Sequence, residues 1–448
     1  MRDVVLTLFL FGSLPFILWR PTYGVFLWAW VSVMSPHRLT WDFAYDFRFA
    51  LLIAIATLVG ILISREPKRL PVTPVTVVLF LLVLWMNVTT LFSLEYDQSL
   101  LMWDRVMKIM LMTFVALFLL HTKLHIQILI WILALSVGFF GIKGGLFTLK
   151  EGGEYRVWGP AGSFIEDNNA LALAIIMIIP LLWYLHHQMK NRWVRWGLLA
   201  AMVLCGLSVL GSHFRGGFVA IMSMIGFLWW KSHTKLVTGF VLAMLVPAII
   251  GFMPDKWDQR MWSIQNYEQD GSAMARFNAW TMAVNIANDR PLVGGGFEVA
   301  TEKVYALYAP DPSVARSLHS VYFQMLGEHG YVGLALFLLL WALVWRDASM
   351  IINQSRSRQD LQWAFDLARM IQVSLIGYAV GGAFLNLSYY DVPYFLLAAL
   401  ALTRVLVEKQ IKSPDQSTVL PVEPQTVNGA QGARREAVAT ARPFNTYR

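Results

Sequence analysis

Residues 170–185 read ALALAIIMIIPLLWYL, a stretch without a single charge. An α-helix needs about 20 mainly apolar residues to cross roughly 30 Å of hydrocarbon. Comparable runs recur near 4–19, 22–35, 47–63, 73–93, 106–120, 124–141, 194–211, 216–230, 236–252, 330–345, 370–387 and 390–406. A backbone in lipid must satisfy its polar groups internally, so these runs are expected to be helices. The sequence predicts an all-α polytopic integral membrane protein with 12 or 13 transmembrane helices, because the two short runs that meet at Arg20-Pro21 could form one broken element.

The composition supports this fold class. The chain has 448 residues, 57% of them hydrophobic and only 14% charged, whereas an average soluble domain is about 25% charged. These values exclude a disordered chain, a disulfide scaffold and an ordinary cytosolic enzyme. The one cysteine, Cys205, lies inside an apolar run and permits neither a disulfide framework nor a cysteine metal site. The net charge of +8 does not require a nucleic-acid partner, because in a membrane protein a Lys/Arg excess is first a topology signal.

The charges of the connectors predict which side of the membrane each one faces. One alternate set carries sixteen Lys or Arg residues, at positions 65, 68, 69, 123, 190, 192, 195, 231, 235, 346, 356, 358, 369, 404, 409 and 412. The opposite short connectors carry seven, at 38, 48, 105, 143, 150, 156 and 215. The richer set is expected to be cytoplasmic. A large external loop over 253–328 then separates transmembrane regions 1–252 and 329–410, and the polar tail 411–448 is expected to be a disordered cytoplasmic extension.

Arg215 lies in the sequence GSHFRGG (211–217), between two apolar runs that leave almost no loop. A guanidinium group stays charged there, so it must meet an anion, backbone carbonyls or water. Gly216 and Gly217 would let a ligand or another part of the backbone approach closely. A snorkelling arginine at a helix end is an equally good interpretation of this residue alone.

The external loop contains further candidates. Arg276 and Trp280 lie one turn apart on a segment that is expected to be helical up to Pro291, with apolar positions that suit a helix along the membrane surface. The run Gly294–Gly296 could expose backbone N–H groups to an anion, although most glycine runs are simply turns. His319, just ahead of the next span, could take a proton near neutral pH, although a lone histidine is more often only hydrogen-bonded.

Two carboxylates and two amides, Glu166 to Asn169, enter the apolar run at 165–185. They need either partners or a role there, and capping of the helix N-terminus is the structural alternative. The sequence has no zinc-site spacing, no Walker loop and no Rossmann fingerprint, so no cofactor is expected. If the protein is an enzyme, its donor is expected to be an anion that is already across the membrane, such as a lipid diphosphate.

Three segments together resemble the O-antigen ligase/polymerase superfamily: GSHFRGG at 211–217, RFNAW to DRPLVGGG at 276–296, and LHSVY to GEHG and Gly333 at 318–333. Two more, MSPHRLTWDFA at 34–44 and GSFIEDNNALA at 162–172, are similar to the exosortase-A-associated O-glycosylation ligase branch. The resemblance spans roughly residues 1–410.

The resemblance implies a GT-C-like glycosyltransferase of the bacterial inner membrane with its active site facing the periplasm. It would transfer a glycan from undecaprenyl diphosphate to a glycan, lipid or protein acceptor, without a metal ion. The family's two arginines and loop histidine match Arg215, Arg276 and His319, which are the expected catalytic residues. Besides the arginines, the expected substrate-binding residues are Trp280, Tyr322, Asn168, Asn169 and Glu166.

Three alternatives stay open at this point. A polymerase would use the same chemistry with another lipid-linked repeat as the acceptor. A lipid or ion transporter could line a path with Arg215 and Glu166, but the sequence has no internal repeat of the kind such transporters often show. A structural subunit of an export complex would not need these polar residues at all.

Overall fold

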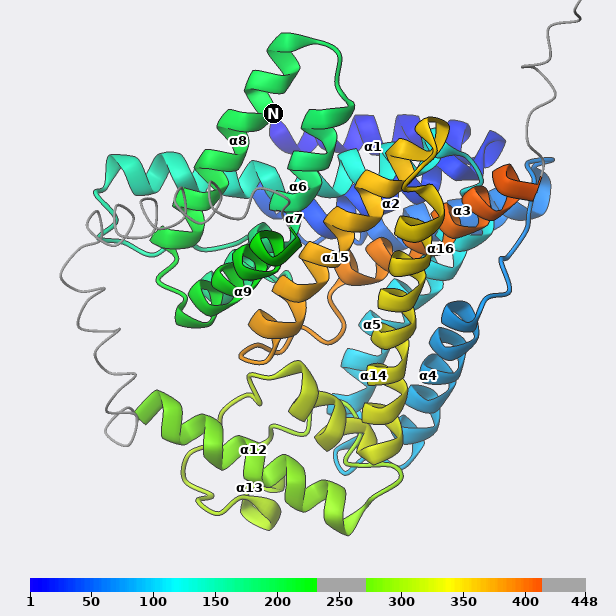
Figure 1. Ribbon diagram of the computed structural model, residues 1–448. Helices are drawn as coiled ribbons and strands as arrows, with labels where there is room; N and C mark the ends of the chain where they lie inside the picture. Colours follow the sequence, from blue (N-terminus) through cyan, green and yellow to red (C-terminus); the bar gives the residue numbers. More distant parts are fainter. Residues whose placement is uncertain (232–270, 413–448) are drawn as a thin grey trace, which may run out of the picture.

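The computed structural model describes residues 1–231 and 271–412 of the chain (Figure 1). Every regular element in these two stretches is helical, which confirms the all-α fold. In chain order the α-helices are α1 (Arg2–Trp19), α2 (Pro21–Met34), α3 (Phe49–Ile63), α4 (Pro74–Leu91), α5 (Tyr96–Leu119), α6 (Lys123–Lys150), α7 (Asn168–Gln188), α8 (Arg192–Gly211), α9 (Arg215–Lys231), α12 (Gly271–Asp289), α13 (Glu302–Tyr308), α14 (Val321–Ser355), α15 (Gln362–Gly382) and α16 (Asp391–Lys412). The apolar run at 236–252, the loop residues 253–270 and the tail after 412 lie outside the described residues.

Six helices in the described part are long and apolar enough to cross a membrane: α1, α4, α6, α7, α8 and α14. This confirms a polytopic membrane protein. The other expected spans that the structure describes also form helices, but α2, α3 and α9 have only 14, 15 and 17 residues. Helices α5, α15 and α16 are longer and carry charged residues within them. The total of 12 or 13 spans therefore stays a prediction.

Several helices extend beyond the apolar runs that predicted them. Helix α5 begins at Tyr96 and α6 ends at Lys150, so Arg105, Lys143 and Lys150 belong to helices and not to connectors. Helix α14 begins at Val321 and crosses a kink at Gly330, where the backbone has a φ of 69°. Residues 321–328 are therefore helical and continuous with the span that follows them. An apolar run therefore predicts only part of a helix. The backbone hydrogen bonds of the helix extend into the polar residues on either side of the run.

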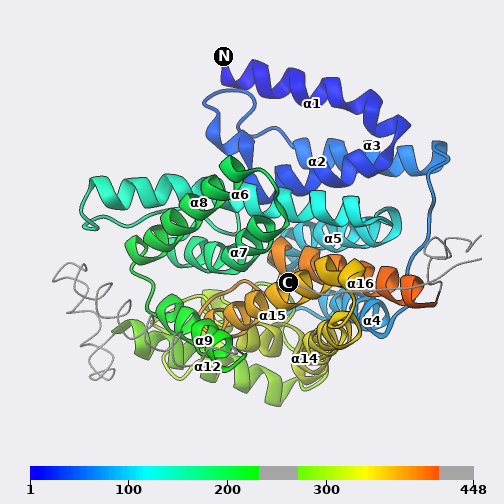
Figure 2. The same ribbon diagram turned by 45° about the horizontal axis from the view of Figure 1, so that its top comes forward.

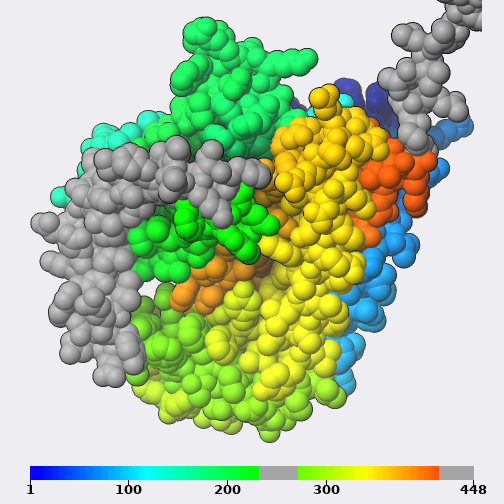
Figure 3. All heavy atoms as spheres, viewed as in Figure 1, coloured from blue at the N-terminus to red at the C-terminus, as the bar shows by residue number. Residues whose placement is uncertain are grey.

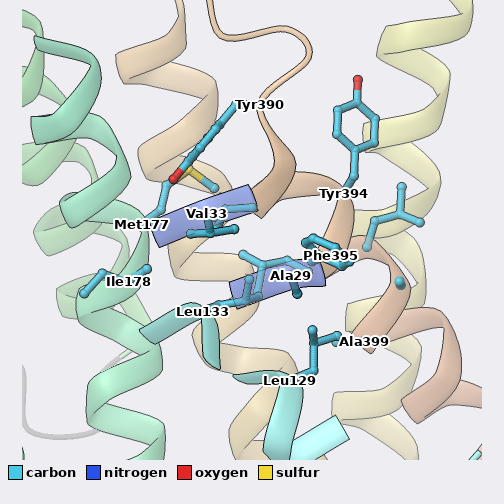
Figure 4. Close-up of a cluster of buried hydrophobic side chains, with 14 of the residues drawn as sticks. Ala29, Val33, Leu129, Leu133, Met177, Ile178, Tyr390, Tyr394, Phe395 and Ala399 are labelled. Carbon is cyan, nitrogen blue, oxygen red and sulfur yellow. The ribbon is translucent and has the colours of Figure 1, made fainter. Parts of the chain in front are cut away.

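The core forms where α2, α6, α7 and α16 meet (Figure 4). The side chains that fill it include Ala29, Val33, Leu129, Leu133, Met177, Ile178, Phe395 and Ala399. Helix α7 is the most enclosed of the six candidate spans, with 83% of its apolar window buried. On one side of this core, α1, α2 and α3 lie together (Figure 2). The central position of α7 fixes its first residues, Asn168 and Asn169, at the end of the bundle.

Helices α12 and α13 lie at the bottom of Figure 1, below α9 and α15, and α12 contacts α14. The expected helix up to Pro291 is confirmed as α12, but its apolar face is not free to lie on a membrane. Ala279, Met282, Ala283 and Ile286 are buried in a second apolar cluster, together with Val299, Val304, Tyr305 and Leu318. The pattern that suggested a membrane-surface helix instead attaches α12 to α13 and to the segment before α14.

A buried polar network joins the loop before α13 to helices α4 and α14. We call it the Glu328 network; its members are Thr89, Gln324, Glu328, His329 and Tyr389. The ring of His329 contacts Thr89 Oγ1 at 2.7 Å and Tyr389 Oη at 2.8 Å, and Tyr389 donates to Glu328. Gln324 Nε2 donates to Glu328 at 3.4 Å, and the backbone N–H of Glu298 donates to it at 3.1 Å. The network therefore connects α4, α14 and the segment before α16.

The run Gly294–Gly296 packs against the same end of α14. The N–H of Gly295 donates to the carbonyl of Gly327 at 2.8 Å, and that of Gly296 donates to the carbonyl of Glu328 at 2.8 Å. The N–H of Gly294 donates to Arg290 at 2.9 Å. The expectation that these groups could hold an anion is wrong, because all three are used inside the protein. A Cβ at Gly294 would lie 2.6 Å from the backbone of Gly330, so the glycines are needed for close packing.

Candidate active site

A cavity of about 270 Å³ opens between the start of α9 and the start of α12. We call it the arginine cavity. Figure 3 shows a hollow between the bright-green α9 and the lime α12 on this face. Its lining residues include Arg156, Asn168, Asn169, His213, Arg215 and Arg276. The fold therefore brings Arg215 and Arg276, which come from helices far apart in the chain, to one cavity.

The tight turn between α8 and α9 places Arg215. The side chain of Asn168 donates to the carbonyl of Ser212 at 2.7 Å, and the ring of His213 contacts the carbonyl of Gly153 at 2.8 Å. His213 has a φ of 57°, a conformation that is uncommon for residues other than glycine. These contacts tie the turn to the start of α7 and to the connector before it. Arg215, the first residue of α9, thus has a defined position at the cavity wall.

Gly216 and Gly217 make room for a side chain of the protein itself. A Cβ at either position would approach the ring of Phe214 to 2.7 or 2.6 Å, and one at Gly216 would also reach Phe384 at 2.8 Å. The close approach predicted at these glycines is therefore made by Phe214 within the same turn. Gly216 still contributes to the cavity lining.

Arg276 lies on α12, one turn before Trp280, and both side chains are half-buried. The indole of Trp280 stacks on Phe323, with ring centroids 4.9 Å apart and planes 10° apart. Its N–H donates to the carbonyl of Leu318 at 2.7 Å. Trp280 therefore connects the helix that carries Arg276 to the segment that carries His319.

His319 is half-buried beside this arrangement and has a φ of 47°. Its Nε2 lies 2.9 Å from Ser317 Oγ. Burial lowers the pKa of His319 below its ordinary value, and the positive charge of Arg276 lowers that pKa further, while Asp167 acts in the opposite direction. The imidazole is consequently neutral at pH 7, the form that can accept a proton. His319 does not line the arginine cavity, but it is within electrostatic reach of Arg276 and Asp167.

The polar residues at the start of α7 divide between two roles. Asp167 caps the helix by accepting from the N–H groups of Asn169 and Ala170, at 2.8 and 3.3 Å, as the structural alternative predicted. Asn168 and Asn169 line the arginine cavity. Glu166 is exposed and accepts from the N–H of Gly162 at 2.8 Å, outside the cavity lining.

Tyr322 is placed away from the arginine cavity. Its hydroxyl donates to the carbonyl of Ala379 at 2.8 Å, and its ring lines a separate cavity between α14 and α15. If Tyr322 binds a substrate, it does so in that neighbouring cavity and not in the arginine cavity.

Arg156 and His213 line the cavity without having been assigned a role from the sequence. The turn around His213 did carry a signal, because GSHFRGG places polar residues between two apolar helices that leave no room for a loop. Arg156 gave no such signal in its polar connector. Within residues 1–231 and 271–412, no group of three or more His, Cys, Asp or Glu side chains could hold a metal ion.

Fold and site together define a polytopic membrane protein with an arginine-lined cavity at one end of its helices. Residues 200–338, which supply Arg215 and Arg276 to that cavity, match the O-antigen ligase (Wzy_C) family. Residues 1–190 match a family of unknown function, DUF5935. No curated protein matches the chain. The O-antigen ligase family suggests a membrane ligase or polymerase that acts on lipid-linked glycans.

Proposed function

We propose that the protein is a membrane glycosyltransferase that transfers a glycan from undecaprenyl diphosphate to an acceptor at the periplasmic face of the bacterial inner membrane. The observation that carries the proposal is the meeting of Arg215 and Arg276 at one cavity within the O-antigen ligase domain. Asn169 adds a hydrogen-bond donor and Arg156 adds a third positive charge. Such a lining suits a diphosphate, because a guanidinium group can bind two phosphate oxygens at once.

The chemistry of transfer assigns roles to these residues. The acceptor hydroxyl attacks the anomeric carbon of the glycan, and a new C–O bond forms while the C–O bond to the diphosphate breaks. The electron pair of the broken bond leaves with undecaprenyl diphosphate, whose developing charge Arg215 and Arg276 stabilise. The proton of the hydroxyl passes to the neutral imidazole of His319. The two fixed positive charges stand where other diphosphate enzymes use a divalent cation, so transfer is proposed to be metal-independent.

Trp280 acts as a positioning residue in this proposal. Its bond to the carbonyl of Leu318 and its stacking on Phe323 hold the backbone next to His319. A loss of this side chain would affect the placement of His319 relative to Arg276 without removing a charge from the cavity.

The periplasmic orientation rests on the positive-inside rule together with the contacts between connectors. The turn after α4, which belongs to the less basic set, contacts the external region through the N–H of Leu94 and the carbonyl of Gly295, at 2.8 Å, and through Lys303 and Glu95, at 2.6 Å. Ala300→Cys tests the orientation, since the one native cysteine, Cys205, is buried. We expect a membrane-impermeant thiol reagent to label position 300 from the periplasm, and protection of this position would contradict the orientation.

Conservative arginine variants test the catalytic assignment. Arg215→Lys and Arg276→Lys keep the positive charge but lose the planar guanidinium fork. We expect each to lower the rate of glycan transfer by about 100-fold or more in a reconstituted assay with the full chain, as for removal of one preorganised oxyanion donor. Each variant should still accumulate normally in the membrane.

Arg192→Lys is the matched control. Arg192 begins α8 as Arg215 begins α9, but Arg192 is exposed. Its guanidinium lies 5.9 Å from the centre of the Trp193 ring. It should transfer glycan at the wild-type rate. Near-native transfer by both Arg215→Lys and Arg276→Lys would contradict the proposed site and favour a transporter or a structural subunit.

A deletion strain separates the ligase from the polymerase. When a ligase is lost, finished polymer should accumulate on undecaprenyl diphosphate, whereas loss of a polymerase should leave single repeat units on the lipid. Mass analysis of the lipid-linked glycans distinguishes the two. We expect finished glycan, and accumulation of single repeats would identify a polymerase.

A further inference from the structure

A second cavity, of about 400 Å³, lies among the end of α2, the start of α3, helix α5 and the start of α16. We call it the N-terminal cavity. Apart from Tyr390 and Asp391, all of its lining residues belong to the stretch that matches the family of unknown function. The two sequence stretches at 34–44 and 162–172 are far apart in the chain, but residues from both line this cavity. The proposed transfer mechanism does not use it.

Positive charge dominates this cavity. Its charged lining consists of the cations Arg38, Arg48, Arg105 and Lys108 and the carboxylates Asp104 and Asp391. Both carboxylates are already engaged, since Asp104 pairs with Lys108 at 2.5 Å and Asp391 accepts from Ser32 Oγ at 2.5 Å. Among the described residues, neither Arg48 nor Arg105 forms an ion pair, and Arg38 pairs at 3.1 Å with Asp46, whose side chain is 88% exposed. The cavity therefore offers guanidinium groups to an anion from outside the protein.

Two of these arginines converge on the connector before α7. Arg105 Nη2 donates to the carbonyl of Gly162 at 3.1 Å, and its guanidinium lies 3.9 Å from the centre of the Phe164 ring. A Cβ at Gly162 would lie 3.1 Å from the Arg38 guanidinium, and this residue has a φ of 71°. Glycine is thus required where both arginines approach the backbone.

The same connector forms part of both cavities. Gly162 to Ile165 line the N-terminal cavity, and Asn168 and Asn169 line the arginine cavity. The three residue steps from Ile165 to Asn168 span at most roughly 11 Å. A molecule in one cavity is therefore separated from the other by a single stretch of chain.

We propose that the N-terminal cavity binds a phosphate or carboxylate group of the acceptor. This inference rests on the proposed function, in which the arginine cavity holds the donor diphosphate and a second substrate must bring its hydroxyl close to it. A lipid-carried phosphate is the expected source, because Trp41 and Phe43, just beyond Arg38, are 84% and 55% exposed and such aromatic residues favour the membrane interface. The cavity would then hold the acceptor's anion while its sugar extends along the shared connector.

Titration of the full chain in neutral detergent tests this inference. The probes are dodecyl phosphate and, separately, glucose 6-phosphate, and isothermal titration calorimetry gives the number of sites and the affinity of each. We expect two anion sites in the wild type. Arg48→Gln should weaken one of them by about tenfold or more, the usual effect of losing a hydrogen bond to a charged group.

Arg48→Gln is the informative variant because Arg48 is exposed and its side chain forms no ion pair with the residues that the structure describes. Arg65→Gln is its matched control: Arg48 precedes the first residue of α3, and Arg65 follows the end of the same helix, exposed and away from the cavity. Arg65→Gln should bind like the wild type. The Arg276→Lys variant should weaken the other anion site and leave the one that depends on Arg48 unchanged.

The outcomes separate the two proposals. Tighter binding of dodecyl phosphate supports a lipid-carried acceptor, and tighter binding of glucose 6-phosphate supports a soluble sugar phosphate in the same cavity. A single anion site that Arg48→Gln leaves unchanged would overturn the inference. The proposed function fails on a different result, which is normal glycan transfer by Arg215→Lys and Arg276→Lys.

Discussion

The region around the arginine cavity and the Glu328 network each contain a histidine, but they differ in what surrounds it. His319 is half-buried and within electrostatic reach of Arg276, although it does not line the cavity. His329, ten positions later, is fully buried, and both of its ring nitrogens contact hydroxyl groups of the protein. One histidine has capacity left for a substrate, and the other has none.

The difference teaches that residue type alone does not identify a reactive group. A polar side chain whose partners are all internal contributes to the packing of a region, since leaving such a group unsatisfied is costly. The Glu328 network holds the loop before α13 against α4 and α14. Polar side chains around the cavity are expected to control activity, whereas those in the network are expected to control stability.

The largest expected effect comes from a matched pair of histidine variants. Asparagine tolerates the positive φ of His319 but cannot act as a base at neutral pH. His319→Asn should lower the rate of glycan transfer by about 100-fold or more, the usual contribution of a positioned general base. The thermal unfolding of the purified protein should be unchanged. A transfer assay and an unfolding scan on the same preparation check both expectations.

His329→Asn should show the opposite behaviour. It disturbs the contacts with Thr89 and Tyr389, so the free energy of unfolding should fall by about 1–3 kcal/mol, the range for a buried polar group that loses its partner. The rate per folded molecule should stay close to that of the wild type. Equal losses of rate per folded molecule in the two variants would remove the distinction between the two regions.

The fold was largely predictable because its signal is repeated along the chain. Runs such as 170–185 indicate helices in lipid whatever surrounds them, and α7 confirms this example. The ends of the helices were less predictable. Residues 96–105 of α5 and 321–328 of α14 are helical, although the apolar runs at 106–120 and 330–345 predicted helices that begin only after them.

The site was predictable only in part. Arg215 and Arg276 stood out because charged residues at these places need a partner, and the structure brings them to one cavity. The roles of His213 and Arg156 depend on a turn and a connector that only the folded chain brings together. The glycines at 294–296 misled for the same reason, since the N–H groups of Gly295 and Gly296 donate to carbonyls near the start of α14.

The pH dependence of transfer sharpens the comparison with a smaller effect. Transfer should decline as the pH falls through the pKa of His319, which lies below its ordinary value near 6.5. Arg316→Gln removes a positive charge that lowers this pKa, so the acidic midpoint should rise. Asp167→Asn keeps a residue that caps α7 but removes a negative charge, so the midpoint should fall. Midpoints that do not move in opposite directions would exclude His319 as the titrating group.

Removal of divalent cations should have the smallest effect, namely none. The proposed diphosphate site relies on Arg215 and Arg276, so the reconstituted enzyme should keep its wild-type rate in excess EDTA. The control is the same assay with added magnesium or manganese. Loss of transfer in EDTA with recovery on addition of either metal would show that the arginines do not replace a cation.

The most direct test of the account is the affinity of the purified full chain for undecaprenyl diphosphate, compared among the wild type, Arg276→Lys and His319→Asn. If Arg276 binds the diphosphate and His319 acts on the acceptor, Arg276→Lys should bind at least about tenfold more weakly, since it loses a charge-assisted hydrogen bond. His319→Asn should bind with nearly wild-type affinity while transferring little glycan. Equal affinity of the wild type and Arg276→Lys would contradict the assignment of the arginine cavity to the donor.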